Sequence, residues 1–422
     1  MTIPRRYFIK TAGLSLFGVG LVPSFLRRTA FALEQPSGSA RRKILVAVFQ
    51  RGAADGLNIV VPFAERDYFA MRPTIAIPQP GRNAGEGRGV IDLNGFFGLH
   101  PALASLKPLF DARHLAIVHA AGSPDNSRSH FDAQDYMESG TPGVKSTQDG
   151  WLNRTLQTEH VPVDSPFQAV ALGPSLPRIL SGKASAVAVS NVNSFGIAGG
   201  NPAAAPLGNT FEAMYAQSVD AVLHGTGQET FDAVKMLKSA DPQHYTPAPG
   251  ANYPKGRFGD ALRQTAQLIK ANLGVQIAFT DIGGWDHHVN EGAVEGQLSN
   301  VLRDFSQSIA AFWTDLGPLG EDTVIVTMSE FGRTARENGT GGTDHGHANA
   351  MFVLGANVKG GKVYGKWPGL ENEQLNEGRD LALTTDFRQV LGEVVTQTLG
   401  ADNLDLVFPG ARLNRGNFLK LV

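Results

Sequence analysis

The strongest constraint on the fold is a series of short, almost uninterrupted apolar runs separated by amphipathic segments. The first run, residues 43–49, is typical of a strand that is buried on both faces of a parallel sheet. Similar runs occupy residues 114–119, 167–172, 275–280, 323–328 and 351–354. Residues 258–269 and 294–316 instead carry apolar side chains at three- and four-residue steps, as helices with one buried face do. This alternation predicts an α/β fold with a mostly parallel central sheet and helices on both faces.

The length and hydrophobicity of the chain are sufficient for one large core. It has 422 residues, of which 42% are hydrophobic. We expect residues 43–422 to form a single domain with an insertion at about residues 181–255. In that stretch the regular alternation gives way to segments rich in Ala, Gly and Pro around two short helix-like stretches.

The N-terminal residues have the features of an export signal. An Arg5-Arg6 pair precedes an aromatic residue, Lys10 and a modestly apolar run, and the sequence Ala-Phe-Ala that ends at Ala32 fits a cleavage site. This arrangement resembles a twin-arginine (Tat) signal peptide. We therefore expect a leader that is removed after Ala32, followed by a linker at residues 33–42.

The apolar run of the leader is a poor membrane span. It is shorter than the ~20 residues that a transmembrane helix needs, and Pro23 interrupts it. We expect the Tat export machinery as a partner, no transmembrane segment in the mature chain, and a location in the periplasm or outside the cell. An uncleaved amphipathic anchor is the alternative interpretation.

Charge and cysteine content exclude several functions. Removal of the leader, which holds five basic and no acidic residues, would change the formal charge from −2 to −7. A mildly acidic chain argues against a nucleic-acid-binding protein. The absence of Cys excludes disulfides, iron–sulfur clusters, blue copper and a Cys nucleophile. A metal site in this chain must use His, Asp, Glu or amide oxygens.

The first segment with polar residues directly after an apolar run contains Asp55. In open α/β sheets, ligands bind beyond the carboxyl ends of the strands. Gly52 and Gly56 flank Asp55 and permit a tight turn there. Asp55 is therefore either a site residue or part of an ordinary Asp-Gly turn.

The second segment, residues 122–132, leads into a predicted helix. Either Ser127 or Ser129 would cap the start of that helix. The same position would stabilise an anion or a deprotonated serine. Arg128 and His130 add an oxyanion partner and a base.

The third segment places Asp281, Asp286, His287 and His288 directly after the run at residues 275–280. Two carboxylates and two imidazoles are costly to bury unless they are paired or bind a metal. Zn²⁺, Mn²⁺, Mg²⁺ or Ca²⁺ would suit such ligands. The alternative is a solvated helix start that Asp286 caps.

The fourth segment follows the run at residues 323–328. Glu330 and Arg333 come first, and Asp344, His345 and His347 lie a few residues further along the chain. Two histidine clusters at strand ends favour one shared metal site over a chance grouping of surface histidines.

The leader and five motifs together resemble a large bacterial family of Tat-exported proteins that is known only as a domain of unknown function. The motifs are Arg-Gly-Ala-Ala-Asp-Gly-Leu-Asn, Ser-Arg-Ser-His-Phe, Gly-Gly-Trp-Asp-His-His, Ser-Glu-Phe-Gly-Arg-Thr and Gly-Thr-Asp-His-Gly-His. That family is similar to the alkaline phosphatase and sulfatase superfamily. The likeness implies a three-layer sandwich with one or two divalent metals above the sheet and a nucleophile at a helix N-terminus.

The resemblance implies roles for particular residues. Ser129, or else Ser127, would be the nucleophile, and Arg51, Arg128 or Arg333 would hold an anionic group. His130 would act as a base beside the nucleophile. The metal ligands would be drawn from Asp55, Asp281, Asp286, His287, His288, Glu330, Asp344, His345 and His347.

The chain departs from the superfamily at Glu330-Phe331, where an Asp-His pair is usual. Glu can bind a metal and Phe cannot, which weakens the second metal site. The chain also lacks the Ser-x-Pro-x-Arg sequence and any Cys from which formylglycine is made, so a standard sulfatase is not expected.

The sequence therefore predicts an exported, metal-dependent hydrolase of phosphate or sulfate esters, with a Ser nucleophile or an activated water. Its substrate would be a small anionic, phosphorylated or sulfated ester. The alternative is an exported binding or scaffolding protein that keeps the fold and a metal without turnover.

Overall fold

The computed structural model describes residues 42–81, 88–158, 165–194, 236–237 and 244–422. The predicted leader, nearly all of the linker and most of the predicted insertion lie outside the described residues. Residues 181–194 of that insertion are described and include β7 (Val187–Val189), a strand of the main sheet. None of the helices in the described parts of the chain combines the length and hydrophobicity that a bilayer span requires.

Within the described residues, the main sheet has nine strands in the order β11-β5-β10-β9-β1-β8-β6-β7, with β12 paired to β5. Its strands are β1 (Ile44–Gln50), β5 (Leu115–Gly122), β6 (Ala169–Leu172), β7, β8 (Ile277–Ile282), β9 (Thr323–Met328), β10 (Asn349–Gly355), β11 (Lys362–Tyr364) and β12 (Thr385–Asp386). Only β10 runs antiparallel to its neighbours, β5 and β9. The mostly parallel sheet predicted from the apolar runs is therefore confirmed.

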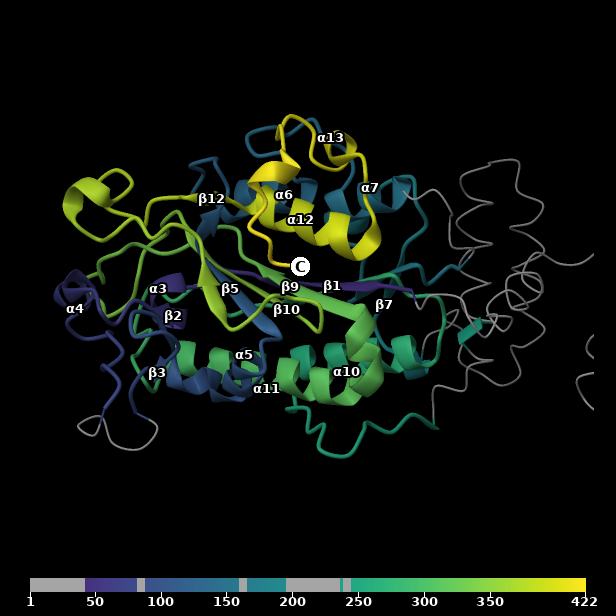
Figure 1. Ribbon diagram of the computed structural model, residues 1–422, viewed down its shortest axis with the longest axis horizontal. Coiled ribbons are helices and arrows are strands. Elements are labelled where there is room, and N and C mark those ends of the chain that lie inside the picture. Colours follow the sequence, from purple (N-terminus) through teal and green to yellow (C-terminus); the bar gives the residue numbers. More distant parts are fainter. Residues whose placement is uncertain (1–41, 82–87, 159–164, 195–235, 238–243) are drawn as a thin grey trace, which may run out of the picture.

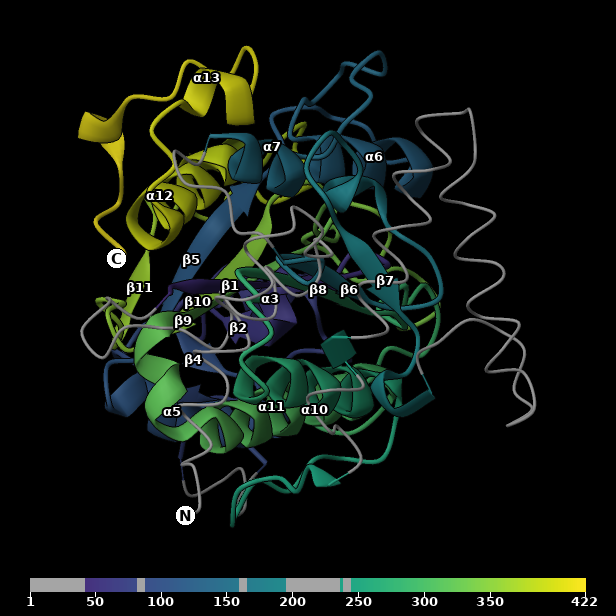
Figure 2. The ribbon, with the colours of Figure 1, turned by 90° about the vertical axis from the view of Figure 1, so that its right-hand side faces the viewer.

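Helices cover both faces of the sheet (Figures 1 and 2). The lower layer in Figure 1 contains α5 (Lys107–Asp111), α10 (Arg257–Lys270) and α11 (Gln297–Leu316). The upper layer contains α6 (His130–Ser139), α7 (Trp151–Gln157), α12 (Phe387–Leu399) and α13 (Leu404–Val407). The protein is thus a three-layer α/β sandwich, as predicted.

The alternation of side chains along β1 shows how one strand serves both layers. Val46 and Val48 belong to the core that includes Phe305 of α11. Leu45 and Phe49 belong to the core on the other face, which includes residues of α7 and α12. Because successive side chains of a strand point to opposite faces, a central strand must be apolar throughout.

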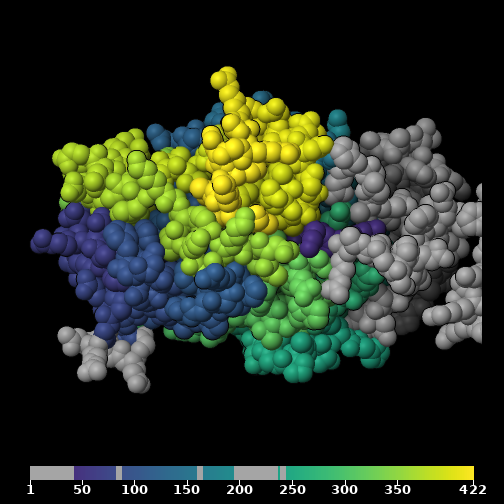
Figure 3. Space-filling model, in the orientation of Figure 1, coloured from purple at the N-terminus to yellow at the C-terminus, as the bar shows by residue number. Residues whose placement is uncertain are grey.

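One end of the sandwich carries an additional lobe. It contains α3 (Gly56–Ile59), α4 (Arg66–Met71) and a small antiparallel sheet of β2 (Val60–Val61), β3 (Ile91–Asp92) and β4 (Gly98–Leu99). Figure 3 shows this N-terminal part, in purple, directly below the yellow-green segment at the left of the molecule. Tyr68 and Met71 share an apolar cluster with Leu370, Leu375 and Leu381. The lobe therefore connects segments that are far apart in the sequence.

Candidate metal centre

Loops from three parts of the chain meet at one edge of the sheet. The carboxyl ends of β1, β5, β8 and β9 and the amino end of β10 lie at this edge. The loop after β5 leads to His130 at the start of α6, the loop after β8 carries Asp286 and His288, and His345 lies between β9 and β10. A β-bridge joins Arg333 to His345 and closes the last loop.

Gly52 allows the loops after β1 and β8 to approach each other. Its φ of +117° lies in a region that residues with a side chain rarely adopt, and a Cβ there would be 3.0 Å from the backbone nitrogen of Asp286. The absence of a side chain at Gly52 therefore leaves room for the backbone of Asp286.

Three histidines of this region each direct Nδ1 toward an oxygen of the protein. Nδ1 of His130 lies 2.9 Å from Oε1 of Glu330, and Nδ1 of His345 lies 2.8 Å from the carbonyl oxygen of Arg128. Nδ1 of His288 lies 3.2 Å from Oδ1 of Asp344. Carboxylates and carbonyls only accept hydrogen bonds, so each Nδ1 carries the hydrogen. In the neutral ring Nε2 is then unprotonated.

The three Nε2 atoms converge on Asp286. Nε2 of His288 and of His345 lie 3.1 and 3.3 Å from Oδ1 of Asp286, and Nε2 of His130 lies 3.4 Å from Oδ2. Ligand atoms of His130, Asp286 and His345 all lie within 4.8 Å of one another. Nε2 of His288 is 3.0 Å from Nε2 of His345. Two unprotonated nitrogens at this distance repel each other unless a proton or a cation lies between them.

Charges and burial set the protonation of these groups. The hydrogen bond that His130 donates to Glu330 raises the pKa of His130, although burial opposes this shift. Burial lowers the pKa of His345. Burial also acts to raise the pKa of Asp286, but the hydrogen bond and charge of Arg333 outweigh it and hold that pKa below its ordinary value. Asp286 is therefore an anion that faces three imidazoles.

Glu330, which the sequence proposed as a metal ligand, lies behind His130 and not among the converging atoms. Its Oε1 accepts hydrogen bonds from the Gly52 N–H at 2.8 Å, from Nε2 of Gln134 at 2.8 Å and from His130. Burial acts to raise its pKa, and the hydrogen bonds from His130 and Gln134 lower it below its ordinary value. This ionised carboxylate fixes the orientation and tautomer of His130.

Arg333 and Asp344 also lie behind the converging atoms. The fully buried Arg333 donates to the carbonyl oxygens of Ala53 and Thr343 and, at 2.5 Å, to Oδ1 of Asp286. Asp344 receives a hydrogen bond from Asn338 in addition to the one from His288. Arg333 thus holds a ligand candidate in place, and its donors face the chain itself rather than an external anion.

Asp55 lies in a different, fully buried cluster. Arg72, which is 0% exposed, binds both carboxylate oxygens of Asp55, with Nη2 at 2.9 Å from Oδ1. Glu291 completes the cluster beside Asp55 and receives a hydrogen bond from Thr343. Burial raises the pKa of Glu291 well above its ordinary value, and the nearby charge of Asp55 adds to the shift. A cation of the chain itself therefore already neutralises Asp55.

The remaining ligand predictions lie apart from the converging atoms. Oδ2 of Asp281 accepts from Nε of Arg51 at 2.7 Å, and Oδ1 accepts from Arg257 at 3.0 Å. His287 is buried, and its Nδ1 has no hydrogen-bond partner among the described residues. His347 is also buried, and burial lowers its pKa. Neither of these two histidines belongs to the group around Asp286.

Ser129 and Ser127 stand at the N-terminus of α6. Ser129 is exposed, and its Oγ accepts a long hydrogen bond, 3.5 Å, from the N–H of Asp132. Oγ of Ser127 accepts from the N–H of Ser129 at 3.3 Å. Arg128 between them donates at 2.7 Å to both Glu377 and Asp380. The helix cap foreseen in the sequence is thus Ser129.

Two residues that contact this region were missed in the sequence. Arg379 donates from Nε to the buried Asp380 at 2.8 Å and from Nη2 to the carbonyl oxygen of His345. Gln134 lies one helical turn after His130 and binds Glu330. The i, i+4 spacing of His130 and Gln134 was the only signal for Gln134, and the sequence around Arg379 offers none.

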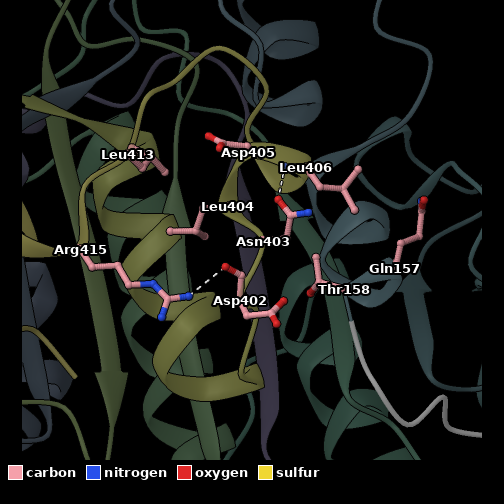
Figure 4. A pocket seen from close by; sticks show the side chains of 9 residues that line it. All are labelled: Gln157, Thr158, Asp402, Asn403, Leu404, Asp405, Leu406, Leu413 and Arg415. Carbon is pink, nitrogen blue, oxygen red and sulfur yellow. Dashed lines mark hydrogen bonds between the residues drawn. The ribbon is translucent and has the colours of Figure 1, made fainter.

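A cavity of about 580 Å³ lies away from the metal centre, beside the end of α7 and beside α13 (Figure 4). Asp402, Asn403 and Asp405 are among its lining residues, and Arg415 donates to the carbonyl oxygen of Asp402 at 3.0 Å. None of its lining residues belongs to the group around Asp286.

The chain belongs to the DUF1501 family, described as proteins of unknown function, because residues 114–403 match that family. The family predicted from the motifs is one of unknown function, in agreement with this match. No curated protein matches the chain.

Among solved structures, the chain is similar to the PsFucS1 sulfatase from Pseudoalteromonas sp., with 12% sequence identity and a TM-score of 0.33. The alignment covers 81% of this chain and 68% of the sulfatase. A likeness this weak carries no argument about the activity of the chain.

Proposed function

We propose that the protein is a metal-dependent hydrolase of phosphate or sulfate esters. The observation that carries the proposal is the convergence of the Nε2 atoms of His130, His288 and His345 on the carboxylate of Asp286. Each imidazole is fixed from behind by an oxygen acceptor, which is the arrangement found around metal-binding histidines.

The donor set fits a divalent ion. His130, His288, His345 and Asp286 would supply three nitrogens and at least one oxygen. Nε2 of His130 is buried and forms no hydrogen bond with any described residue. Imidazole-rich sets favour Zn²⁺ or another transition metal, whereas Mg²⁺ and Ca²⁺ prefer oxygen ligands. We therefore propose Zn²⁺ or Mn²⁺ rather than Mg²⁺ or Ca²⁺.

When bound, such an ion would supply Lewis-acid polarisation of an ester oxygen and a lowered pKa for a bound water. The chain would contribute two arginines, Arg128 and Arg379, that hold an anion beside the metal ion. Arg128 supplies the carbonyl that orients His345, and Arg379 binds the carbonyl of His345. Both guanidinium groups are anchored on the buried Asp380 and are partly exposed, at 29% and 44%. We assign them to the anionic group of the substrate.

We propose Ser129 as the nucleophile in preference to Ser127. Its side chain is exposed, and its hydroxyl makes one long hydrogen bond with the described part of the chain. Ser129 also directly precedes the ligand candidate His130 at a helix N-terminus. The helix dipole there favours an alkoxide or a transferred oxyanion. Ser127 is used as an acceptor within the turn.

We also propose export through the Tat pathway to the periplasm or the medium, based on the Arg5-Arg6 leader. A fusion of residues 1–42 to a folded reporter should be exported, and replacement of both Arg by Lys should retain it in the cytoplasm. Export that is unaffected by this replacement would contradict the proposal.

A binding protein that holds a metal without turnover is the second candidate. The observation in its favour is the pairing of Arg128 with both Glu377 and Asp380, which occupies donors that a substrate would need. The two proposals predict the same metal content and differ in turnover.

The experiment that separates them uses untagged, metal-loaded protein with an aryl phosphate, a diaryl phosphodiester and an aryl sulfate. We expect hydrolysis of at least one substrate and a loss of at least about 100-fold in Ser129→Ala. Ser127→Ala serves as the matched control and should retain activity. Wild-type activity no higher than that of Ser129→Ala and Asp286→Asn would favour the binding protein.

A further inference from the structure

A second cavity, of about 280 Å³, opens at the same edge of the sheet as the metal centre. It lies between the loop after β6, the end of β8 and the start of α10. Leu172, Gly173 and Phe279 are among its less polar lining residues. Three arginines and two carboxylates form its polar wall: Arg51, Arg178, Arg257, Glu138 and Asp281. It shares no residue with the group around Asp286.

Arg51 is held rigidly at the base of this cavity. It donates to Asp281 at 2.7 Å, to Glu138 at 2.9 Å and to Gln134 at 2.9 Å. Its guanidinium also lies 4.5 Å from the centre of the Phe49 ring. Desolvation by burial acts to lower the pKa of Arg51, and the nearby carboxylates more than offset this effect. Arg51 is therefore a fixed, permanent positive charge.

The acceptors of the cavity wall are already engaged. Oδ1 and Oδ2 of Asp281 accept from Arg257 and Arg51 respectively. Oε1 of Glu138 accepts from Arg51, and Oε2 accepts from the N–H of Ile179 at 2.9 Å. Each carboxylate oxygen thus has a donor before any ligand arrives.

The wall also has hydrogen-bond donors that the described part of the protein does not use, and they belong mainly to Arg257. The side chain of Arg257 is 73% exposed, and the one hydrogen bond that it forms uses only a fraction of its N–H groups. Arg178 is more engaged, since its Nη2 donates to the carbonyl oxygen of Thr147 and its Nε lies 2.9 Å from Oδ1 of Asp135. A concave wall with engaged acceptors and spare guanidinium donors is suited to an oxyanion.

A chain of hydrogen bonds connects this cavity to the metal centre. Nη1 of Arg51 donates to Oε1 of Gln134, whose Nε2 donates to Glu330, which in turn accepts from His130. Because guanidinium can only donate and the ionised carboxylate can only accept, the orientation of the Gln134 amide is fixed. The two sites are therefore neighbours along one edge.

We infer that this cavity, which we call the Arg51–Arg257 pocket, is an oxyanion-binding subsite. It takes a phosphate, sulfate or carboxylate group, with Arg257 supplying the donors and Arg178 adding positive charge. We assign the pocket to a second acidic group of the substrate, apart from the ester that is hydrolysed. This assignment rests on the proposed hydrolase function, whereas oxyanion binding by the pocket does not.

The test measures oxyanion binding with the metal centre emptied. Full-length mature protein is stripped with a chelator, and phosphate, sulfate and acetate are titrated by calorimetry at constant ionic strength, with chloride as the reference anion. We expect saturable binding of at least one oxyanion and a loss of about tenfold or more in Arg257→Gln, the cost of one charge-assisted contact. Arg178→Gln should weaken binding in the same direction.

Arg263→Gln is the matched control, because Arg263 lies on the same helix, pairs with Asp260 and does not line the pocket. It should bind as the wild type does. Equal affinity in wild type, Arg257→Gln and Arg178→Gln, or no binding at about 100 mM oxyanion, overturns the inference. Binding that Arg257→Gln abolishes in a protein without hydrolytic activity would retain the pocket and reject the hydrolase.

Discussion

Two acidic clusters near the same edge of the sheet neutralise their charge in different ways. In the first, the chain provides its own cation: Arg72 binds both oxygens of Asp55 and donates to the carbonyls of Thr334 and Ala335. In the second, Arg333 reaches only Oδ1 of Asp286, and the Nε2 atoms of three histidines converge on the carboxylate. The first cluster is complete as it stands, whereas the second is where we propose that a divalent metal binds.

The comparison shows why residue type alone did not identify the ligands. Asp55 and Asp286 both follow buried strands, and both lie in motifs from which the family was predicted. What separates them is whether a guanidinium reaches both carboxylate oxygens, and Arg72 lies 17 residues from Asp55 in the sequence. A buried ion pair of this kind is costly to break from one side, since the remaining charge has no partner.

Breaking the first cluster should have the largest effect. Arg72→Met leaves Asp55 buried and unpaired, and we expect a loss of about 3–5 kcal/mol in the free energy of unfolding. Denaturant unfolding would measure it, with Arg66→Met on the exposed side of α4 as the control. A loss below about 1 kcal/mol would mean that Arg72 does not neutralise Asp55.

The buried His119, outside the metal centre, should give a pH dependence of the unfolding free energy of similar size. Burial lowers the pKa of His119 to about 4, and both ring nitrogens are satisfied, with Nδ1 accepting from Ala120 and Nε2 donating to Val60. In the unfolded chain the imidazole binds a proton with its ordinary pKa of 6.5, whereas the folded state resists protonation until about pH 4. The folded state therefore loses stability as the pH falls from about 6.5 to 4.

The expected loss from His119 is about 3 kcal/mol over that range. His119→Gln should flatten the dependence of unfolding free energy on pH, whatever its stability at pH 7. An unchanged slope between wild type and variant would contradict a neutral, buried His119.

A smaller effect is expected from a change behind the metal centre. Glu330→Gln keeps the shape of the side chain but removes the charge that orients His130, and we expect metal affinity to fall about 10- to 100-fold. Competition with a chromogenic chelator would measure the affinity. Glu337→Gln, which only affects a carboxylate that binds Thr74 and Ile75, should leave it unchanged. Equal affinities in both variants would remove Glu330 from the support of the centre.

The smallest effect on stability is expected at the cap of α6. Ser129→Ala should lower the free energy of unfolding by about 0.5–1 kcal/mol, because its capping hydrogen bond is long. Thermal unfolding would test this, and a loss above about 2 kcal/mol would assign Ser129 a structural role larger than a cap.

Much of the fold was predictable from the sequence, because buried parallel strands and one-sided helices leave strong periodic signals. The runs at residues 43–49 and 323–328 became β1 and β9, and the pattern at residues 294–316 became α11. The two-residue strands β2, β3 and β4 had no such signal, since a pattern needs several residues to be visible.

The candidate site was predictable in composition but not in arrangement. His130, Asp286, His288 and His345 were all singled out because they follow strands. The positions of Glu330 and Asp344 behind the rings depend on side-chain directions that only the folded loops define. Arg379 and Gln134 were missed because a single Arg or Gln on a loop or helix carries no distinguishing pattern.

The central claim is that Asp286 with its three histidines binds one divalent metal and that Asp55 and Asp281 do not. The most direct measurement is the elemental analysis of untagged protein after loading with Zn²⁺ or Mn²⁺ and removal of excess metal. We predict about one equivalent in the wild type, less than about a tenth in Asp286→Asn, and an unchanged value in the matched variant Asp281→Asn. Metal that persists in Asp286→Asn, or a wild type that binds none, would contradict the account.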